Sequence, residues 1–498
     1  MRNPIPGPRF PLITRLQAIY HDLRGNGAQH LDKLHQKYGP IVQTGPKRLS
    51  VGDASGLRDV YLLPRRLDRP APLSVLHNYG SENLVSTVDG DLHQDRRGPL
   101  RNVFAVGAIE SERVQGGIAN AVKHLIERLD AHAGADSEPV DLRPLLRAAL
   151  QDAMSVVVYG HDNALSVQKD EKQRVAMKID NEWQRTRFFN MWTLIDFYLP
   201  GLALQLHRAR LAPKTAYGYV PKDIYMNKVG RRALERLRDP SYRENGADTD
   251  TMIFRLVSKF QSEGPSAALP SDEYILSDCL DHFWAGVITT LDALLPTIEH
   301  LSQPENQQRQ QRLRQELHSA MDDDHLGPKE LSRTLKALPY LDAVLRESIR
   351  LRPPIPVALE RRVSAREGSI VVHGREVPEG WNVSAAASVL HHSQNVFEKP
   401  EEWCPERWLV EGSDESEMRK ERARVMKRHF FAFGSGSRMC IGVNVAWSIM
   451  RQVIAAIYGG METRVDKGLK QKTRLGREWK VMVRLRNIGS GRKSQMEH

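Results

Sequence analysis

A glycine-rich segment near the C-terminus, residues 433–442, carries a single cysteine whose surroundings could do chemistry. Its glycines open backbone conformations that are closed to other residues, so a flat ligand could lie close to the main chain. Arg438 places a fixed positive charge two residues before Cys440. Apolar residues recur at helical spacing from Ile441 to Tyr458, which puts the cysteine near a helix N-terminus, where an anion is favoured. This cysteine could bind a metal as a thiolate, or it could be an ordinary buried thiol.

The spacing of the neighbouring residues distinguishes these two interpretations. Phe433, Gly436, Arg438, Cys440 and Gly442 match the signature Phe-x-x-Gly-x-Arg-x-Cys-x-Gly, and five fixed positions rarely agree by chance. Here the sequence resembles the cytochrome P450 family. The resemblance implies that Cys440 is the axial thiolate ligand of the iron of haem b. It also implies that Arg438 pairs with a haem propionate, that Phe433 packs beside the sulfur, and that Gly442 belongs to the same cofactor-binding loop.

A second motif, Ala-Gly-Val-Ile-Thr-Thr at 285–290, lies in a long helical pattern that opens with Ser271 as its predicted N-cap. Gly286 costs a helix interior roughly 1 kcal/mol relative to alanine, so it needs a reason. Two explanations remain open: the glycine could make room for a ligand, or it could allow close contact with another helix. The resemblance implies that this helix crosses the distal face of the haem, and that Thr289 hydrogen-bonds bound oxygen, with Thr290 beside it.

The family pattern usually has an acidic residue just before this threonine, whereas this chain has Ile288. Three explanations are open. Protons could come from water or substrate polar groups, they could come from Asp292 one turn further on, or the reaction could need no proton delivery. Because Thr289 and Thr290 are both present, we favour oxygen activation. Pro296 is predicted to kink the helix beyond this site.

Further basic residues could bind carboxylates. His93 and Arg97 are four residues apart, so they share one helix face, and a solvated basic face is the alternative. The resemblance implies that this pair contacts the haem propionates and that Arg361 is another propionate-binding arginine. A surface charge beside Arg362 is the alternative for Arg361. Arg96 is predicted to be only a surface charge.

Glu347 and Arg350 lie three residues apart on one predicted helix face, and alone they could form a surface pair worth a few tenths of a kcal/mol. The prolines at 353–354 end that helix, and Arg407 follows in Pro-Glu-Arg-Trp. The resemblance implies the family's Glu-x-x-Arg helix with its downstream arginine. We therefore expect one buried charged network with a structural role, costly to break by removing one member.

Local patterns predict the other elements. The predicted elements are a helix at 29–38, a hairpin of 41–44 and 48–51, a mostly helical region from 139 to 237, and strands at 369–372, 381–384 and 481–485. The resemblance makes the aromatic-rich part of the helical region, 183–198, a lid over the pocket. It makes the loop at 70–90 a pocket cover. The candidate substrate contacts are Leu76, Tyr79, Leu84, Phe283, Ala285, Val357 and Ala358.

The 498 residues would suggest about three domains, but no linker, charge block or repeat divides them. The resemblance spans nearly the whole chain and implies one large domain of the cytochrome P450 fold, mainly α with small β-sheets. We expect a proline-rich hinge at 1–15, a catalytic domain at 16–488 and a disordered tail at 489–498.

Composition limits the compartment and the partners. Three cysteines cannot form a disulfide framework and indicate a reducing compartment. The net charge of +11 suits a nucleic acid, an anionic membrane or an acidic protein. The basic residues are spread along the chain without interleaved aromatics, so no nucleic-acid partner is expected.

No apolar run is long enough for a transmembrane helix. The proline-rich start resembles the hinge that follows the membrane anchor of microsomal family members. If an anchor was removed, the resemblance implies the cytoplasmic face of the endoplasmic reticulum membrane, with peripheral membrane contact. Otherwise we expect a cytoplasmic protein.

The function implied by the resemblance is a haem-thiolate monooxygenase that uses O2 to oxidise an apolar small molecule, by hydroxylation, epoxidation or a related reaction. No flavin or nicotinamide motif is present, so a separate flavoprotein reductase is expected to supply electrons. The sequence looks similar to fungal members of secondary metabolism. Ile288 keeps a haem-thiolate isomerase, dehydratase or oxidative coupling enzyme as the alternative, and a haem-bearing sensor ranks third.

Overall fold

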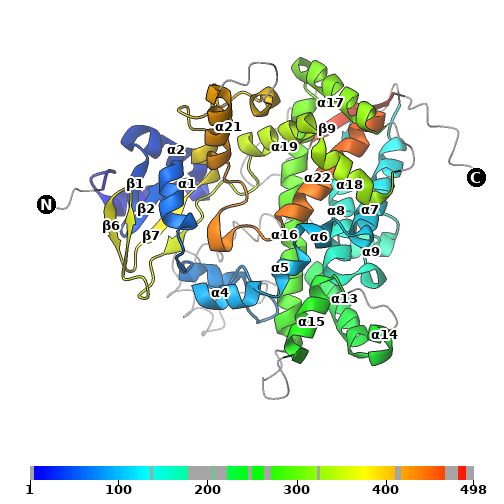
Figure 1. Ribbon diagram of the computed structural model, residues 1–498, viewed down its shortest axis with the longest axis horizontal. Coiled ribbons are helices and arrows are strands. Elements are labelled where there is room, and N and C mark those ends of the chain that lie inside the picture. The colour runs from blue at the N-terminus through cyan, green and yellow to red at the C-terminus, as the bar shows by residue number, and fades with distance from the viewer. Residues whose placement is uncertain are drawn as a thin grey trace, which may run out of the picture.

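The computed structural model describes residues 5–134, 138–177, 205, 221–244, 249–262, 271–321, 326–409, 417–465 and 481–488. The predicted aromatic lid at 183–198 and the predicted tail at 489–498 lie outside these residues. Within them the fold is mainly α with small sheets, as the sequence predicted. Figure 1 shows the four-stranded sheet beside one end of a larger helical body.

The helices make up most of the described chain. Their bounds are α1 Pro11–Leu23, α2 Gly27–Tyr38, α3 Ala54–Leu57, α4 Gly90–Arg97, α5 Leu100–Val103, α6 Val106–Ile109, α7 Glu112–Asp130, α8 Leu142–Tyr159, α9 Glu171–Ala176, α13 Pro221–Arg238, α14 Pro240–Glu244, α15 Met252–Ser262, α16 Asp272–Leu301, α17 Gln307–Ala320, α18 Pro328–Ala337, α19 Pro339–Leu351, α20 Ala387–His391, α21 Glu417–His429 and α22 Val443–Gly460.

The strands form three small sheets with the orders β1-β2-β7-β4, β3-β9-β8 and β5-β6. Their bounds are β1 Ile41–Gly45, β2 Arg48–Val51, β3 Val140–Asp141, β4 Arg361–Arg362, β5 Ser369–Val372, β6 Arg375–Pro378, β7 Asn382–Ala385, β8 Met461–Val465 and β9 Met482–Asn487.

The predicted hairpin is confirmed, because β1 pairs antiparallel with β2. β2 then pairs in parallel with β7, which aligns Leu49 with Val383. Both of these side chains are buried, so the sheet turns one apolar face into the core. The edge strand β4 pairs with β7 and carries Arg361.

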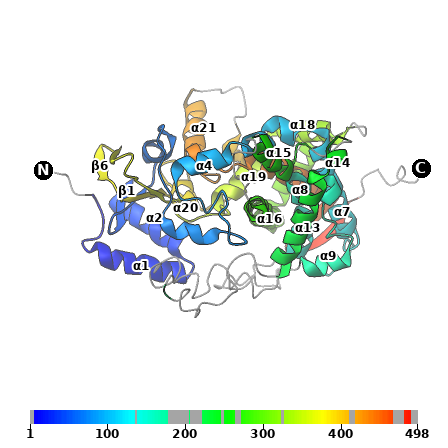
Figure 2. The same cartoon turned by 90° about the horizontal axis from the view of Figure 1, so that it is seen from below.

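Helix α16 is the central element of the helical body. Ser271 occupies its N-cap position, and Asp272 and Glu273 lie in its first turn, where the helix dipole favours acidic residues. The helix continues past Pro296 to Leu301. It packs against α8, α13, α19 and α22, and Figure 2 shows it nearly end-on among neighbouring helices.

The N-terminal helix α1 begins at Pro11, within the segment that the sequence analysis assigned to a hinge. Proline is favoured in the first turn of a helix because the missing N–H has no partner there in any case. Four large apolar side chains of this region are exposed at helical spacing, namely Phe10, Ile13, Leu16 and Tyr20. Within the described residues, no helix combines the length and the apolar composition needed to span a bilayer.

Candidate active site

Helix α16 is buried on all but one face along its central turns. Between Ile275 and Glu299, the residues with accessible surface are Asp281, Ala285, Gly286, Ile288, Thr289 and Asp292. Apart from Gly286, their spacing of three and four residues places them on a single face. Neighbouring helices cover the other faces, so this stripe is the part of central α16 that a ligand can reach.

Thr289 lies on the stripe, and its hydroxyl donates to the Ala285 carbonyl oxygen at 2.7 Å. The lone pairs of that hydroxyl remain available to a ligand. Thr290 is buried and lies off the stripe. Phe283 is also off the stripe, since its fully buried ring packs edge-on against Trp284 and tilted against Tyr159.

The packing of α16 against α8 explains why residue 286 is a glycine. A Cβ atom at this position would overlap the end of the Met154 side chain on α8. The close helix contact proposed as one alternative from the sequence therefore accounts for this glycine. Its cost to the helix, roughly 1 kcal/mol, is offset by the close approach of two long buried helices.

The loop that carries Cys440 is shaped by two glycines. Gly434 and Gly436 have φ of 67° and 71°, and a Cβ on Gly436 would overlap the carbonyl oxygen of Tyr61. The amide of Cys440 donates to the Phe433 carbonyl oxygen at 2.8 Å, which closes the loop. Helix α22 starts three residues after the cysteine with Gly442 as its N-cap, as the apolar spacing indicated.

The thiol of Cys440 is both accessible and enclosed. It has open surface, yet burial raises the pKa of the thiol, opposed by the Gly442 amide and by Arg97. The side chain is therefore surrounded by protein atoms but can still be reached by a ligand. No group of three metal-binding side chains occurs among the described residues, so a metal at Cys440 would take its other ligands from a bound group.

Four arginines and one histidine form a cationic cluster near this loop. Burial, together with the charges of Arg438, Arg69, Arg97 and Arg361, lowers the pKa of His93 to about 2. Burial together with Arg69 and Arg361 lowers the pKa of Arg438 to about 8, despite two nearby carboxylates. Such crowding of positive charge is unfavourable unless anions join it.

Unsatisfied polar atoms within the cluster also point to a missing anionic partner. Nδ1 of His93 and Nε of Arg438 are buried without a hydrogen-bond partner among the described residues. The remaining nitrogens of Arg438 donate to the carbonyl oxygens of Thr87, Val88 and Asp89, which fixes the guanidinium in place. A planar group bearing a metal and two carboxylates fits this donor set.

Arg69 is the member of the cluster that sequence reasoning missed. Burial and the charge of Arg361 lower its pKa to about 10, against an opposing effect of Asp281. It donates to the Val85 carbonyl oxygen. No motif surrounds Arg69 in the sequence, so only the folded arrangement assigns it to the cluster.

The prediction that Arg96 is a surface charge is wrong. Its Nε donates to the buried carboxylate of Asp278 on α16 at 2.7 Å, and its guanidinium lies 3.7 Å from the centre of the Tyr274 ring. The same carboxylate accepts the amide of Leu84 at 2.7 Å. Asp278 therefore fastens both α4, through Arg96, and the loop before it, through Leu84, to the central helix, because a buried carboxylate requires such partners.

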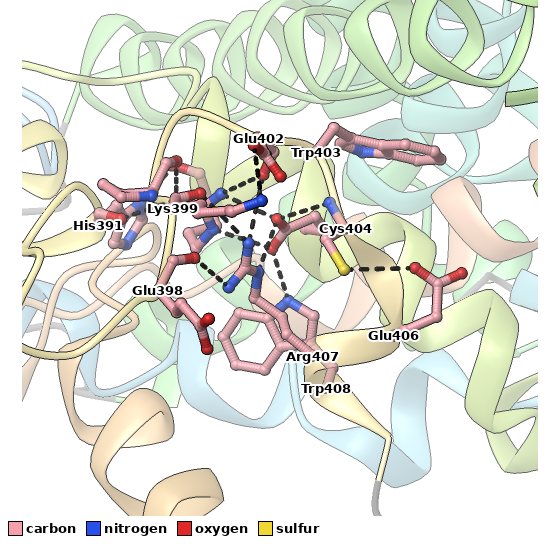
Figure 3. A network of polar contacts seen from close by, with 12 residues as sticks. His391, Glu398, Lys399, Glu402, Trp403, Cys404, Glu406, Arg407 and Trp408 are labelled. Carbon is pink, nitrogen blue, oxygen red and sulfur yellow. Dashed lines mark hydrogen bonds and ion pairs between the residues drawn. The ribbon is translucent and has the colours of Figure 1, made fainter. Parts of the chain in front are cut away.

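The predicted network of Glu347, Arg350 and Arg407 forms a compact buried cluster (Figure 3). Arg350 donates twice to the Glu347 carboxylate at 2.8 Å, and both side chains are 0% exposed. Arg407 donates to the same carboxylate at 2.9 Å, and Trp408 also donates to it at 2.9 Å. Burial alone would raise the pKa of Glu347, but the hydrogen bonds and charges of the two arginines outweigh burial and lower it.

A buried histidine connects this network to the cysteine loop. His391 Nδ1 lies 3.0 Å from the Arg350 carbonyl oxygen, and its Nε2 accepts the Phe431 amide at 2.9 Å. Burial lowers the pKa of His391 to about 3, so the ring is neutral and its Nδ1 is the donor. Sequence reasoning did not include His391.

The other substrate candidates occupy mixed positions. Leu84 is buried, and the Tyr79 hydroxyl donates to the Asp223 carbonyl oxygen at 2.6 Å. Val357 is exposed, while Leu76 and Ala358 are half-buried. Their contact with a substrate stays a prediction.

Comparison with known proteins extends over nearly the whole chain. The family model for cytochrome P450 matches residues 4–487. Cytochrome P450 monooxygenase FGM1 of Gibberella zeae is 26% identical over 469 residues, 93% of this chain and 87% of that protein. Fusicoccadiene C-8 hydroxylase of Alternaria brassicicola is 26% identical over 481 residues, 92% of this chain and 84% of that protein. N-acetyltryptophan 6-hydroxylase ivoC of Emericella nidulans is 26% identical over 465 residues, 91% of this chain and 84% of that protein.

Proposed function

The chain belongs to the cytochrome P450 family and is a haem-thiolate monooxygenase, and we propose that it oxidises an apolar secondary metabolite with electrons from a flavoprotein reductase. The observation that supports this most is Cys440, an enclosed thiol with open surface beside a cluster of arginines in which two buried nitrogens, of His93 and Arg438, have no hydrogen-bond partner among the described residues. The hydroxylases among the relatives favour oxygen insertion over the isomerase, dehydratase and coupling alternatives.

The residues of the site have different proposed roles. When bound, haem b would supply the oxygen and electron chemistry, which an axial thiolate biases toward O–O cleavage. Cys440 would bind the iron, because coordination deprotonates a thiol even where burial opposes it. His93, Arg97, Arg361 and Arg438, joined by Arg69, would hold the two propionates.

On helix α16, the Thr289 hydroxyl is proposed to hold a proton where oxygen reacts. Its hydrogen bond to the Ala285 carbonyl oxygen fixes the hydroxyl hydrogen, which leaves the oxygen lone pairs free to accept a hydrogen bond. Gly286 and Thr290 would support this turn from the packed faces of α16. Ile288 adds apolar surface that keeps water from the reacting atoms.

The direct test is turnover with isotopically labelled O2 and a fungal flavoprotein reductase, using a panel of apolar metabolites that first produce a spectral shift in the ferric protein. One labelled oxygen atom in the product is expected for each molecule oxidised. Conversion without reductase, or product without label, would instead identify an isomerase, a dehydratase or a coupling enzyme.

A basic surface groove of about 1090 Å³ is the proposed docking site for the reductase. Gly436 and Ser437 of the cysteine loop line it, together with Arg65, Arg66 and Arg101. Electrons delivered at this groove would have a short path to Cys440, because the cysteine loop lines the groove. The positive charge would steer an acidic partner, as the net charge of +11 suggested.

Arg101→Glu is expected to raise the KM for the reductase about tenfold, with a steeper loss at low ionic strength, because rim charges act mainly on association. Arg101 is exposed, and its charge has no carboxylate partner among the described residues. Steady-state kinetics against reductase concentration measures the effect. Arg486→Glu, at an exposed position of β9, is the matched control. Equal KM values for both variants would contradict this docking site.

Peripheral contact with the cytoplasmic face of the endoplasmic reticulum membrane is also proposed. The exposed apolar side chains of α1 and the residue before it support this, since a helix with such a stripe can lie in a bilayer interface.

A further inference from the structure

The proposed reaction consumes protons as well as electrons. Insertion of one oxygen atom into a C–H bond follows RH + O2 + 2 e⁻ + 2 H⁺ → ROH + H2O, with the electrons supplied by the reductase. A site from which bulk water is excluded needs a group that delivers those protons. Ile288, the residue before Thr289, has no proton to give.

Two carboxylates share the accessible stripe of α16 with Thr289. Asp281 stands eight residues before Thr289, about 12 Å away along the helix axis. It lies toward Arg69 of the cationic cluster, whose pKa it raises. Asp292 stands three residues after Thr289, which places it about one turn away on the same face. Only Asp292 is close enough in helical geometry to serve the threonine hydroxyl.

The carboxylate of Asp292 is held loosely and keeps accessible surface. Its nearest charged partner is Arg143 on α8, whose Nη1 lies 3.7 Å from Oδ1, beyond hydrogen-bond distance. The Asp292 side chain is 38% exposed, whereas that of Arg143 is 6% exposed. Among the described residues, no group donates a hydrogen bond to Asp292. Its oxygens can therefore bind water or a ligand within the space.

The charges around Asp292 suit a group that gains and loses a proton. Burial raises its pKa, while Arg143 and Arg147 on α8 lower it, and the net shift is upward. These two arginines are the charged groups of the described residues that act on it. Enclosure thus favours the protonated acid, and the arginines keep the ionised form accessible.

We infer that Asp292 is the carboxylic acid that delivers protons to the oxygen site beside Thr289, steadied by Arg143. The inference rests on the proposed monooxygenase function and assigns the proton source that Ile288 leaves open. Twice in each turnover the acid releases its proton toward the threonine side, and each time it is reprotonated from water that reaches the open carboxylate.

Asp292→Asn tests the inference, because the amide keeps the shape but cannot release a proton. We expect the product formed per electron pair to fall at least tenfold, with the electrons diverted to peroxide, and the solvent isotope effect on turnover to change. The reduced carbon monoxide complex should keep its thiolate-type band, which shows that the cysteine–iron centre and the fold are intact. Asp292→Glu should retain most of the coupling.

A rescue variant separates proton delivery from packing. Ile288→Glu placed in the Asp292→Asn background restores a carboxylic acid one residue before Thr289, and we expect coupling to recover. A readout independent of turnover is the infrared carbonyl band of a protonated acid. In the resting protein this band should persist at pH values above those at which an ordinary aspartate ionises. It should be missing in Asp292→Asn.

Unchanged coupling and an unchanged solvent isotope effect in Asp292→Asn would overturn the inference. So would an infrared titration that shows no difference between the two proteins. Loss of the thiolate-type band in the unmodified protein would instead refute the proposed function, so the two failures are distinguishable.

Discussion

Cys440→Ser should abolish monooxygenase turnover while leaving a folded protein. Serine keeps the size of the side chain, and the Cys440 amide bond to the Phe433 carbonyl oxygen does not depend on the sulfur. The alcohol cannot supply the thiolate that favours O–O cleavage. Product formation is expected to fall by at least about a thousandfold, equivalent to about 4 kcal/mol of barrier. The reduced carbon monoxide complex should lose its thiolate-type band.

Cys404→Ser is the matched control for this variant. Cys404 is half-buried, and its thiol donates to Glu406 at 3.4 Å, a bond that a serine hydroxyl can also make. Its spectrum and turnover should match those of the unmodified protein. A thiolate-type band that persists in Cys440→Ser would remove the basis of the proposed function.

Glu347→Gln is expected to lower the free energy of unfolding by about 3–5 kcal/mol, because it leaves Arg350 and Arg407 without their shared carboxylate. The damage should extend to the cofactor. His391 connects the Arg350 carbonyl oxygen to the Phe431 amide, so disorder in the network reaches the loop of Cys440. Chemical denaturation and the fraction of thiolate-type complex would measure both effects.

An exposed pair of the same geometry provides the control. Glu421 and Arg424 are also three residues apart, at 3.2 Å, but both side chains are more than half exposed. Glu421→Gln should change the free energy of unfolding by less than about 0.5 kcal/mol. Similar losses in the two variants would show that burial does not govern the energetics of the network.

The contribution of Glu347 to the free energy of unfolding should depend on pH. Its pKa in the folded protein is lowered, so its contribution to stability is fully present above the unfolded value of about 4.3. The contribution is lost as the pH falls through the lower folded pKa. The difference in unfolding free energy between the unmodified protein and Glu347→Gln should therefore shrink below about pH 4. A constant difference across this range would contradict the lowered pKa.

The sequence predicted those parts of the fold and site that local spacing encodes. The hairpin of β1 and β2, the end of α19 before its prolines, and the start of α22 after Cys440 follow from periodicity, proline and glycine. The Glu347 network followed from a resemblance, and its burial is confirmed. These features depend on residues close together in the chain or on a shared motif.

What the sequence could not supply depends on contacts between distant residues. Arg96 and Arg97 are adjacent and chemically identical, and only the position of Asp278, on another helix, decides which is buried. Arg69 joins the cationic cluster through folding alone. The sequence left Asp292 as one of three explanations, because helical spacing cannot reveal which face of α16 is open.

The parallel pairing of β2 with β7 sets a limit on when the enzyme can mature. Residues 48–51 leave the ribosome early, but their partners at 382–385 are made more than three hundred residues later. Contacts so distant in the chain form slowly and late. Arg361 sits on the neighbouring strand β4, so that wall of the cofactor site is assembled in the same late step. Haem capture must therefore follow synthesis of most of the chain, because this wall and Cys440 both come from its last third.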